Sequence, residues 1–421
     1  MGYSGARGGL EAILAAEDLV RRCRDHAPAP WADTGQITAR FRLAVDRVMG
    51  EAGLYDEPTA AHAFRQAEGD TLEAAHLVRA HRSALPRLAR SEPVDPDEMV
   101  VLRRIVPAHR TPDGPQLLGR TSDYTGRLLE RPDGPPAATN GRLADHKGAT
   151  RGPEAGDSGA GNGRLAEGDG ATRGLLEAGD SGAETGRLAG GNGATRGAGR
   201  GDAERHPRRF SELLREMDLL VDHRPADPAA PRPEPFDVTR RPARPPAPRS
   251  AVLASMARAE TGALVGLWYR SVLGPDGNVH EVTLGEVRHG RLPLRVRHPH
   301  TGAPVTVGHF RATETEAIED LDGADEDRGR FDLGYGLCFG HNERKAIAMA
   351  NLDIACRRFG RDTPLGQLLL LTVDGLDSGG FLEHLKLPHY VTFRSMVDRK
   401  LAVRGTGERP RATDPIGKDC T

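Results

Sequence analysis

The amino-acid sequence predicts an α+β protein, with a helical N-terminal part, a mixed α/β C-terminal part and a long disordered repeat insertion between them. Three observations support this fold class: apolar residues at helical spacing near the start, alternating polar and apolar residues in the second half, and glycine-rich repeats between the two. A length of 421 residues suits two or three domains. We divide the chain into segments 1–130, 131–207, 208–249, 250–403 and 404–421.

The first segment is expected to be mainly helical. Residues 10–23 and 37–48 place apolar side chains three and four positions apart, which is typical of amphipathic helices. A further helix is expected over 71–88, because Asp70 can cap its first turn and Pro93 stops it.

The insertion at 131–207 repeats two short fragments. GRLA begins at residues 141, 163 and 186, and GATRG begins at residues 148, 170 and 193. Each copy holds one or two leucines among glycine, alanine, aspartate and arginine, so its apolar surface cannot offset the entropy lost on ordering. We therefore expect a disordered insertion that contributes no catalytic residue.

The second half of the chain is expected to begin with a short helix over 210–220. Nine prolines between residues 225 and 248 then predict an extended linker. The elements expected after the linker are a helix over 250–257, strands over 263–273 and 279–307, a helix and loop over 314–327, and a disordered tail from residue 404. His298 and His300 are assigned to a turn.

Composition excludes several classes of function. The formal net charge is −2 although 28% of the residues are charged, so no basic field exists to attract nucleic acid. The four cysteines lie far apart, and the N-terminus lacks the apolar core of a signal peptide. No apolar run approaches the roughly 20 residues of a membrane helix. We expect a cytoplasmic, reduced protein that binds neither membranes nor nucleic acid.

A glycine-rich stretch before a helix is the first signal of chemistry. Gly334 and Gly336 lie in the sequence GYGLCFGHNERK, where a turn that runs into a helix would offer backbone N–H groups to a phosphate. Arg344 and Lys345 would add positive charge. The stretch is neither a Walker A loop nor a dinucleotide fingerprint, so a packed turn with Asn342 as N-cap is the alternative.

A histidine pair and several carboxylates are the other candidates. His384 and His389 are separated by Pro388, so they could converge on a metal only around a bend, and two independent histidines are the alternative. Glu286, Glu314 and Glu316 lie near expected strand ends. Their carboxylates could serve acid–base chemistry, and the alternative is that they simply lie on the surface.

Several blocks taken together resemble one family, the I subunit of the bacterial carbon–phosphorus lyase core complex. The similarity covers most of the chain outside the repeat insertion, and the order and spacing of the blocks are specific. The blocks are LAVDRVM from residue 43, QAEGDTLEAAHLVR from 66, QLLG from 116, DYT from 123, GYG from 334, ERKA from 343 and HLKLPHY from 384.

The resemblance implies an enzyme subunit that uses Mg-ATP as substrate and displaces its adenine by an alkylphosphonate, giving a ribose 1-phosphonate 5-triphosphate. Alone, such a subunit acts as a purine nucleosidase. The resemblance also implies partner subunits G, H, J, K and L, two copies per core complex, and zinc held by His384 and His389 near subunit J. The departing purine needs an acid, for which Glu286, Glu314 and Glu343 are candidates.

Two other functions compete with the ribosyl-transfer subunit. The chain could be a non-catalytic scaffold that contributes only a zinc-linked interface. It could also be a stand-alone metal-dependent hydrolase, although that reading rests on the histidine pair alone. Cleavage of the carbon–phosphorus bond is excluded, because that radical step needs an iron–sulfur cluster on clustered cysteines, which this chain lacks.

Overall fold

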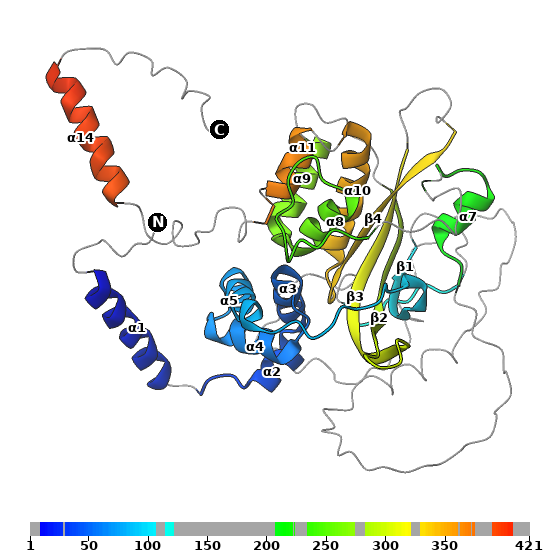
Figure 1. Ribbon diagram of the computed structural model, residues 1–421, viewed down its shortest axis with the longest axis horizontal. Helices are drawn as coiled ribbons and strands as arrows, with labels where there is room; N and C mark the ends of the chain where they lie inside the picture. The colour runs from blue at the N-terminus through cyan, green and yellow to red at the C-terminus, as the bar shows by residue number, and fades with distance from the viewer. Residues whose placement is uncertain are drawn as a thin grey trace, which may run out of the picture. The chain divides into compact units, whose positions relative to one another are not determined.

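A computed structural model confirms the α+β class (Figure 1). It describes residues 9–27, 30–106, 114–121, 207–221, 223, 234–273, 283–320, 329–360, 363–371, 373–374 and 390–406. The repeat insertion 131–207, apart from residue 207, lies outside the described residues, as do His384 and His389.

The elements follow one another in the order helices, strand, helices, strands, helices. Their bounds are α1 Gly9–Asp25, α2 Thr34–Arg40, α3 Arg42–Ala52, α4 Glu57–Gln66, α5 Thr71–Ala84, η1 Pro96–Glu98, β1 Val100–Ile105, α7 Phe210–Glu216, α8 Arg249–Arg258, α9 Thr261–Leu273, β2 Thr283–Arg297, β3 Pro304–Asp320, β4 Phe331–Phe339, α10 Glu343–Phe359, α11 Pro364–Leu371 and α14 Tyr390–Thr406. Among the described residues, no helix has the length and apolar character needed to span a membrane.

The N-terminal helices confirm most of the helical predictions. Asp70 caps α5 by accepting hydrogen bonds from the backbone N–H groups of Leu72 and Glu73, at 2.9 and 3.2 Å. The expected helix over 37–48 is interrupted at Phe41, whose backbone leaves the helical region between α2 and α3. The buried apolar residues of these helices form one core: Ile37, Val45, Val48, Met49, Ala52, Ala60, Ala61, Ala63, Ala74, Ala75 and Val78.

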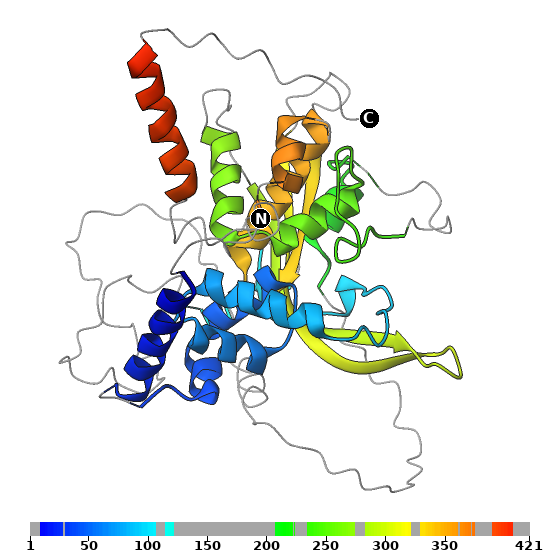
Figure 2. The same ribbon diagram turned by 60° about the vertical axis from the view of Figure 1, so that its left-hand side comes forward.

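The four strands form one antiparallel sheet in the order β1-β2-β3-β4. The predicted strand pattern over 279–307 is confirmed from residue 283 onward as β2, the start of β3 and the turn between them, which contains His298 and His300; residues 279–282 lie outside the described residues. The hairpin of β2 and β3 extends beyond the other two strands, as Figure 2 shows. We call its outer part, residues 292–310, the arm.

Each face of the sheet is covered by different helices. Helix α10 packs on β3 and β4, and α8, α9 and α11 join it in a core that includes Met256, Leu264, Leu352 and Leu369. Helix α7 covers the opposite face (Figure 1). We call these the α10 face and the α7 face.

Helix α10 approaches β4 closely because the strand has glycine where side chains would point at the helix. The buried positions of β4 alternate, and Gly334 and Gly336 occupy two of them. A Cβ atom on Gly334 would overlap the carbonyl oxygen of Ala350, and one on Gly336 would overlap that of Ala346. The predicted glycine-rich turn is therefore wrong for these residues, which belong to a strand.

Two further local predictions are wrong. Residues 263–273, expected to be a strand, form α9, whose first backbone N–H groups are capped by the side chain of Glu260. Residues 314–320, expected to be helical, complete β3. The alternation in this segment is a strand pattern: Glu314, Glu316 and Ile318 face α7, whereas Thr315, Ala317 and Glu319 face α10. Helix α14 also runs past the expected boundary at 404, to Thr406.

The close contact between α10 and β4 predicts a large effect of one methyl group. Gly334→Ala should lower the free energy of unfolding by about 1–3 kcal/mol, because α10 must move to admit the side chain. Urea unfolding followed by circular dichroism measures this change. Gly308→Ala is the matched control, since a Cβ atom there meets no heavy atom within 4 Å. Equal unfolding midpoints for the two variants would contradict the packing argument.

Candidate functional site

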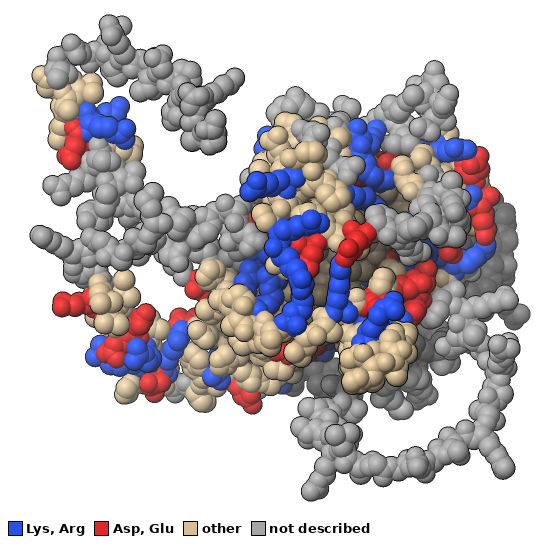
Figure 3. All heavy atoms as spheres, in the orientation of Figure 1, with Lys and Arg blue, Asp and Glu red and all other residues tan. Residues whose placement is uncertain are grey.

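The end of the α10 face where β4 turns into α10 carries a cluster of polar side chains from five separate parts of the chain. We call it the His289–His341 cluster; its members are Arg42, Asp46, Arg103, His289, Arg311, Thr313, His341 and Glu343. Figure 3 shows one face of the molecule, on which basic and acidic side chains are interspersed rather than gathered by sign.

The turn between β4 and α10 is fixed by two neighbouring elements. Gly340 adopts φ +70°, and a Cβ atom there would overlap Asp46, so glycine is required on both counts. The hydroxyl of Thr313 donates to the carbonyl of Gly340 at 2.6 Å and accepts from the backbone N–H of Asn342 at 3.1 Å. The Asp46 carboxylate accepts from the backbone N–H of His341 at 3.0 Å. The His341 side chain is thereby held over the sheet.

His341 stacks on His289, which comes from β2. Their ring centroids are 4.5 Å apart and the ring planes differ by 15°. Nδ1 of His289 lies 3.1 Å from the hydroxyl oxygen of Thr313, which already uses its hydrogen on Gly340 and therefore accepts. Burial, together with the neighbouring His341 and Arg311, lowers the pKa of His289 to about 3. This ring is neutral at neutral pH.

A chain of hydrogen bonds runs from Arg42 through His341 to Glu343. A terminal guanidinium nitrogen of Arg42 donates to Nδ1 of His341 at 2.7 Å, which leaves the hydrogen of the neutral ring on Nε2. Nε2 lies 3.4 Å from the Glu343 carboxylate. Arg103 binds the same carboxylate with Nε and a terminal nitrogen. Burial alone would raise the pKa of Glu343, but hydrogen bonds from His341 and Arg103 outweigh it and lower this pKa to about 2.

The other two catalytic candidates lie on the α7 face, away from Glu343. Glu286 accepts from Nε of Arg104 at 2.7 Å and from the backbone N–H of Phe210 at 3.0 Å. Glu314 binds Arg288, with nitrogen–oxygen distances of 2.5 and 2.9 Å. Glu316, beside them, binds Arg209 at 2.9 Å. These carboxylates are buried and each is matched by an arginine, so the structure does not bring the three predicted catalytic residues together.

The four residues expected to bind phosphate, Gly334, Gly336, Arg344 and Lys345, also lie in different surroundings and do not form one site. Gly334 and Gly336 lie in the ladder between β3 and β4, facing α10. Arg344 is exposed on the first turn of α10. Lys345 is fully buried, and its ammonium group donates to the carbonyl of Ala259 at 2.8 Å, while burial lowers its pKa. The Lys345 ammonium therefore lies in the core rather than at the start of the helix.

Sequence reasoning found Glu343 but missed most of the cluster. A usable signal existed for Arg103, because the pair Arg103–Arg104 interrupts an otherwise apolar strand, and a buried charge in a strand requires a partner. His341 lies within the glycine-rich stretch that was singled out but was not itself selected, and His289 carries no local pattern. Within the described part of the chain, no group of three or more histidine, cysteine, aspartate or glutamate side chains could hold a metal ion.

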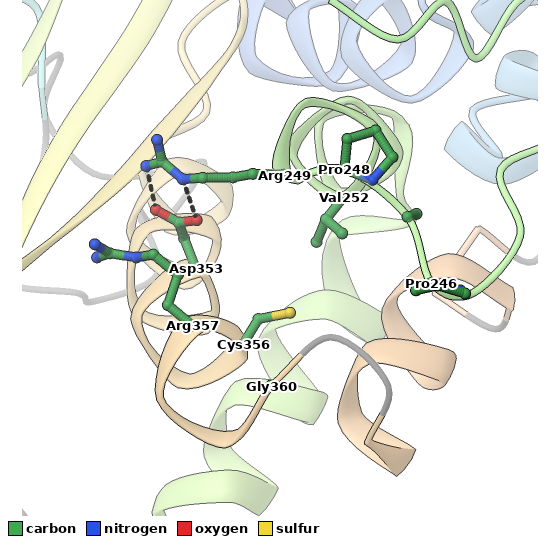
Figure 4. A pocket seen from close by; sticks show the side chains of 9 residues that line it. Pro246, Pro248, Arg249, Val252, Asp353, Cys356, Arg357 and Gly360 are labelled. Carbon is green, nitrogen blue, oxygen red and sulfur yellow. Dashed lines mark hydrogen bonds and ion pairs between the residues drawn. The ribbon is translucent and has the colours of Figure 1, made fainter. Parts of the chain in front are cut away.

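A separate cavity of about 730 Å³ lies between the start of α8 and the C-terminal half of α10 (Figure 4). Arg249 reaches across it to Asp353 through two hydrogen bonds of 2.8 and 2.6 Å. Arg357, also in its lining, pairs with Asp332 at 3.2 Å. Because both arginines have carboxylate partners, this cavity offers a ligand no unmatched charge, in contrast to the His289–His341 cluster.

The low pKa of His289 predicts a pH effect on stability. The unfolded chain takes up a proton near pH 6.5, whereas the folded chain does so only near pH 3, so acid favours unfolding between these values. Relative to His289→Asn, the natural chain should lose about 1 kcal/mol of unfolding free energy between about pH 7 and about pH 5.5. Urea unfolding at both pH values measures the loss. His309→Asn, at an exposed position of β3, should behave like the natural chain; a loss of the same size in His289→Asn would refute the burial argument.

Comparison with known proteins places the chain in a family. A family model described as "Bacterial phosphonate metabolism protein (PhnI)" matches residues 2–406. The chain is 38% identical over 407 residues to the putative C-P lyase subunit protein HtxH of Stutzerimonas stutzeri, covering 95% of each chain. It is 33% identical to the alpha-D-ribose 1-methylphosphonate 5-triphosphate synthase subunit PhnI of Rhizobium meliloti, covering 99% of this chain and 98% of the relative. The Escherichia coli protein of the same name is 32% identical, with coverage of 94% and 96%. The chain therefore belongs to the PhnI family of bacterial phosphonate metabolism proteins.

Proposed function

We propose that this chain is the subunit in which an alkylphosphonate displaces adenine from ATP, and that it acts as a purine nucleosidase when alone. The observation that carries the proposal is its similarity, over nearly the whole chain, to two relatives named as subunits of a ribose 1-methylphosphonate 5-triphosphate synthase. The partners would be the G, H, J, K and L subunits, with two copies of this chain in the core complex.

The proposed reaction exchanges one bond at the ribose for another. An oxygen of the phosphonate forms a bond to C1′ as the bond from C1′ to N9 of adenine breaks, and adenine leaves with that electron pair and takes up a proton from the solvent. In the nucleosidase reaction, water replaces the phosphonate. Positive charge develops on the ribose in the transition state, so a fixed negative group beside C1′ lowers the barrier.

Of the three carboxylates considered, Glu343 suits the ribosyl site best. Its low pKa keeps it ionised, so it would stabilise the developing positive charge rather than donate a proton. Glu286 and Glu314 are fully buried against arginines on the α7 face, whereas Glu343, although it is also paired with an arginine, is partly exposed and can be reached by a substrate. Arg344, exposed one residue after Glu343, is available to a phosphate of the nucleotide.

The alternative is a scaffold subunit without a ribosyl site. The arm favours this alternative. Within the arm, β3 pairs with β2 along one edge, and its other edge pairs with no described strand, so that edge could receive a strand of a partner subunit.

Release of adenine separates the two functions. Purified chain, alone and in the assembled complex, is incubated with Mg-ATP with and without methylphosphonate, and free adenine is quantified by chromatography. Glu343→Gln keeps the size of the side chain but removes its charge, so adenine release should fall by about tenfold or more. Glu92→Gln, which removes a carboxylate paired with Arg297 on the arm, is the matched control and should retain activity. Absence of adenine release even in the natural complex would establish the scaffold function.

We also propose that His384 and His389 bind zinc at the interface with subunit J. Two imidazoles supply half of a tetrahedral shell, so a partner group or water must complete it, and zinc should bind the isolated chain weakly. Replacing both histidines with alanine should lower the zinc content of the assembled complex, measured by elemental analysis, and spare adenine release by the isolated chain. The control variant carries alanine at His298 and His300 in the exposed turn. Full zinc occupancy in the His384/His389 variant would refute the assignment.

A further inference from the structure

Arg42 is the guanidinium of the cluster whose charge has no matching carboxylate. Among the residues that the structure describes, its hydrogen bonds go to Nδ1 of His341 at 2.7 Å and to the carbonyl of Arg120 at 3.2 Å, and it makes no ion pair. The two other arginines of the cluster differ, since Arg103 binds Glu343 and Arg311 binds Asp46 and Glu57.

The surroundings of Arg42 destabilise a positive charge that has no carboxylate partner. The side chain is partly buried, and burial lowers its pKa; Arg120 and Arg311 add to this effect, while the more distant carboxylates of Asp46 and Glu343, with which Arg42 makes no ion pair, oppose it. A partly desolvated cation beside two others is stabilised when an anion replaces the water it has lost. The imidazole of His341 is a neutral acceptor and does not supply that charge.

The way in which Arg42 is held favours an anion with several oxygens. His341 engages one terminal nitrogen and the carbonyl of Arg120 the other, which fixes the plane of the guanidinium. A planar guanidinium matches two oxygens of a phosphate or phosphonate, whereas an ammonium group cannot make this paired contact. The guanidinium lies beside His341 and hence beside Glu343, the proposed ribosyl site.

We propose that Arg42, together with Arg120, binds a phosphorus oxyanion of the substrate, and that His341 is the positioning residue that orients Arg42. The choice of a phosphorus oxyanion as ligand rests on the proposed function. Two sources share this chemistry, the phosphates of the nucleotide and the phosphonate that replaces adenine. Binding of the anion would place its charge where the cluster carries an excess of positive charge.

The test measures binding of each source separately to the purified full-length chain. Inorganic tripolyphosphate and methylphosphonate are titrated by calorimetry at constant ionic strength. Arg42→Gln should weaken binding of at least one of them by about tenfold or more, since a charge-assisted hydrogen bond is lost. Arg40→Gln, which removes an exposed positive charge two residues away, is the matched control and should bind like the natural chain. The anion that depends on Arg42 identifies the source.

Two variants of His341 test the positioning role. His341→Asn places an amide oxygen where Nδ1 accepts from Arg42, so binding should be largely retained. His341→Leu removes the acceptor, and the affinity should fall toward that of Arg42→Gln while the thermal unfolding midpoint shows that the chain remains folded. Retained affinity in His341→Leu would refute the positioning role.

The outcomes separate this inference from the proposed function. If neither anion binds, or if binding is equal in Arg42→Gln and the natural chain, the inference is overturned even when adenine is released from ATP. If binding depends on Arg42 but no adenine is released, the oxyanion site stands and the ribosyl-transfer function fails.

Discussion

The carboxylate of Asp46 is the interaction on which both the fold and the cluster depend. It is completely buried, and its two oxygens accept from Arg311 of β3 and from the backbone of His341, each at 3.0 Å. The backbone carbonyl of Asp46 accepts a hydrogen bond from the side-chain amide of Asn342 at 3.2 Å. A buried carboxylate is tolerated only when such partners replace its hydration. One residue of α3 therefore joins the N-terminal helices to the sheet and to the start of α10.

The sheet separates two kinds of electrostatic environment. On the α7 face, arginines and glutamates are matched and buried, so their charges are satisfied within the protein. On the α10 face, the matched pairs of Arg103 and Arg311 surround Arg42, which lacks a carboxylate among the described residues. Neighbouring residues of a strand point to opposite faces. Arg103 therefore binds Glu343 on the α10 face, while Arg104, next to it in sequence, binds Glu286 on the α7 face.

The sequence predicted the elements whose signals are local. Asp70 marked the start of α5, and His298 and His300 were assigned to a turn, which the structure places between β2 and β3. Segments whose polarity is set by tertiary partners were misread, as in β3, where Glu314 looks solvated in the sequence but is buried against Arg288. The same limit applies to the cluster. Glu343 was found through the helix it begins, whereas His289 meets His341 only because β2 and the β4–α10 turn are brought together by the fold.

The arm has a consequence for how the free subunit behaves in solution. Residues 304–310 of β3 present an edge that pairs with no other described strand, with Val305 and Val307 exposed by 41% and 57%. Such an edge can template pairing with a second chain. On the neighbouring strand β2, Arg295 and Arg297 are paired with Glu98 and Glu92, so this part of the arm carries little net charge that would repel a second chain. Self-association of the free subunit through the arm would rest on backbone pairing and apolar contact rather than on net charge, and should therefore depend little on ionic strength.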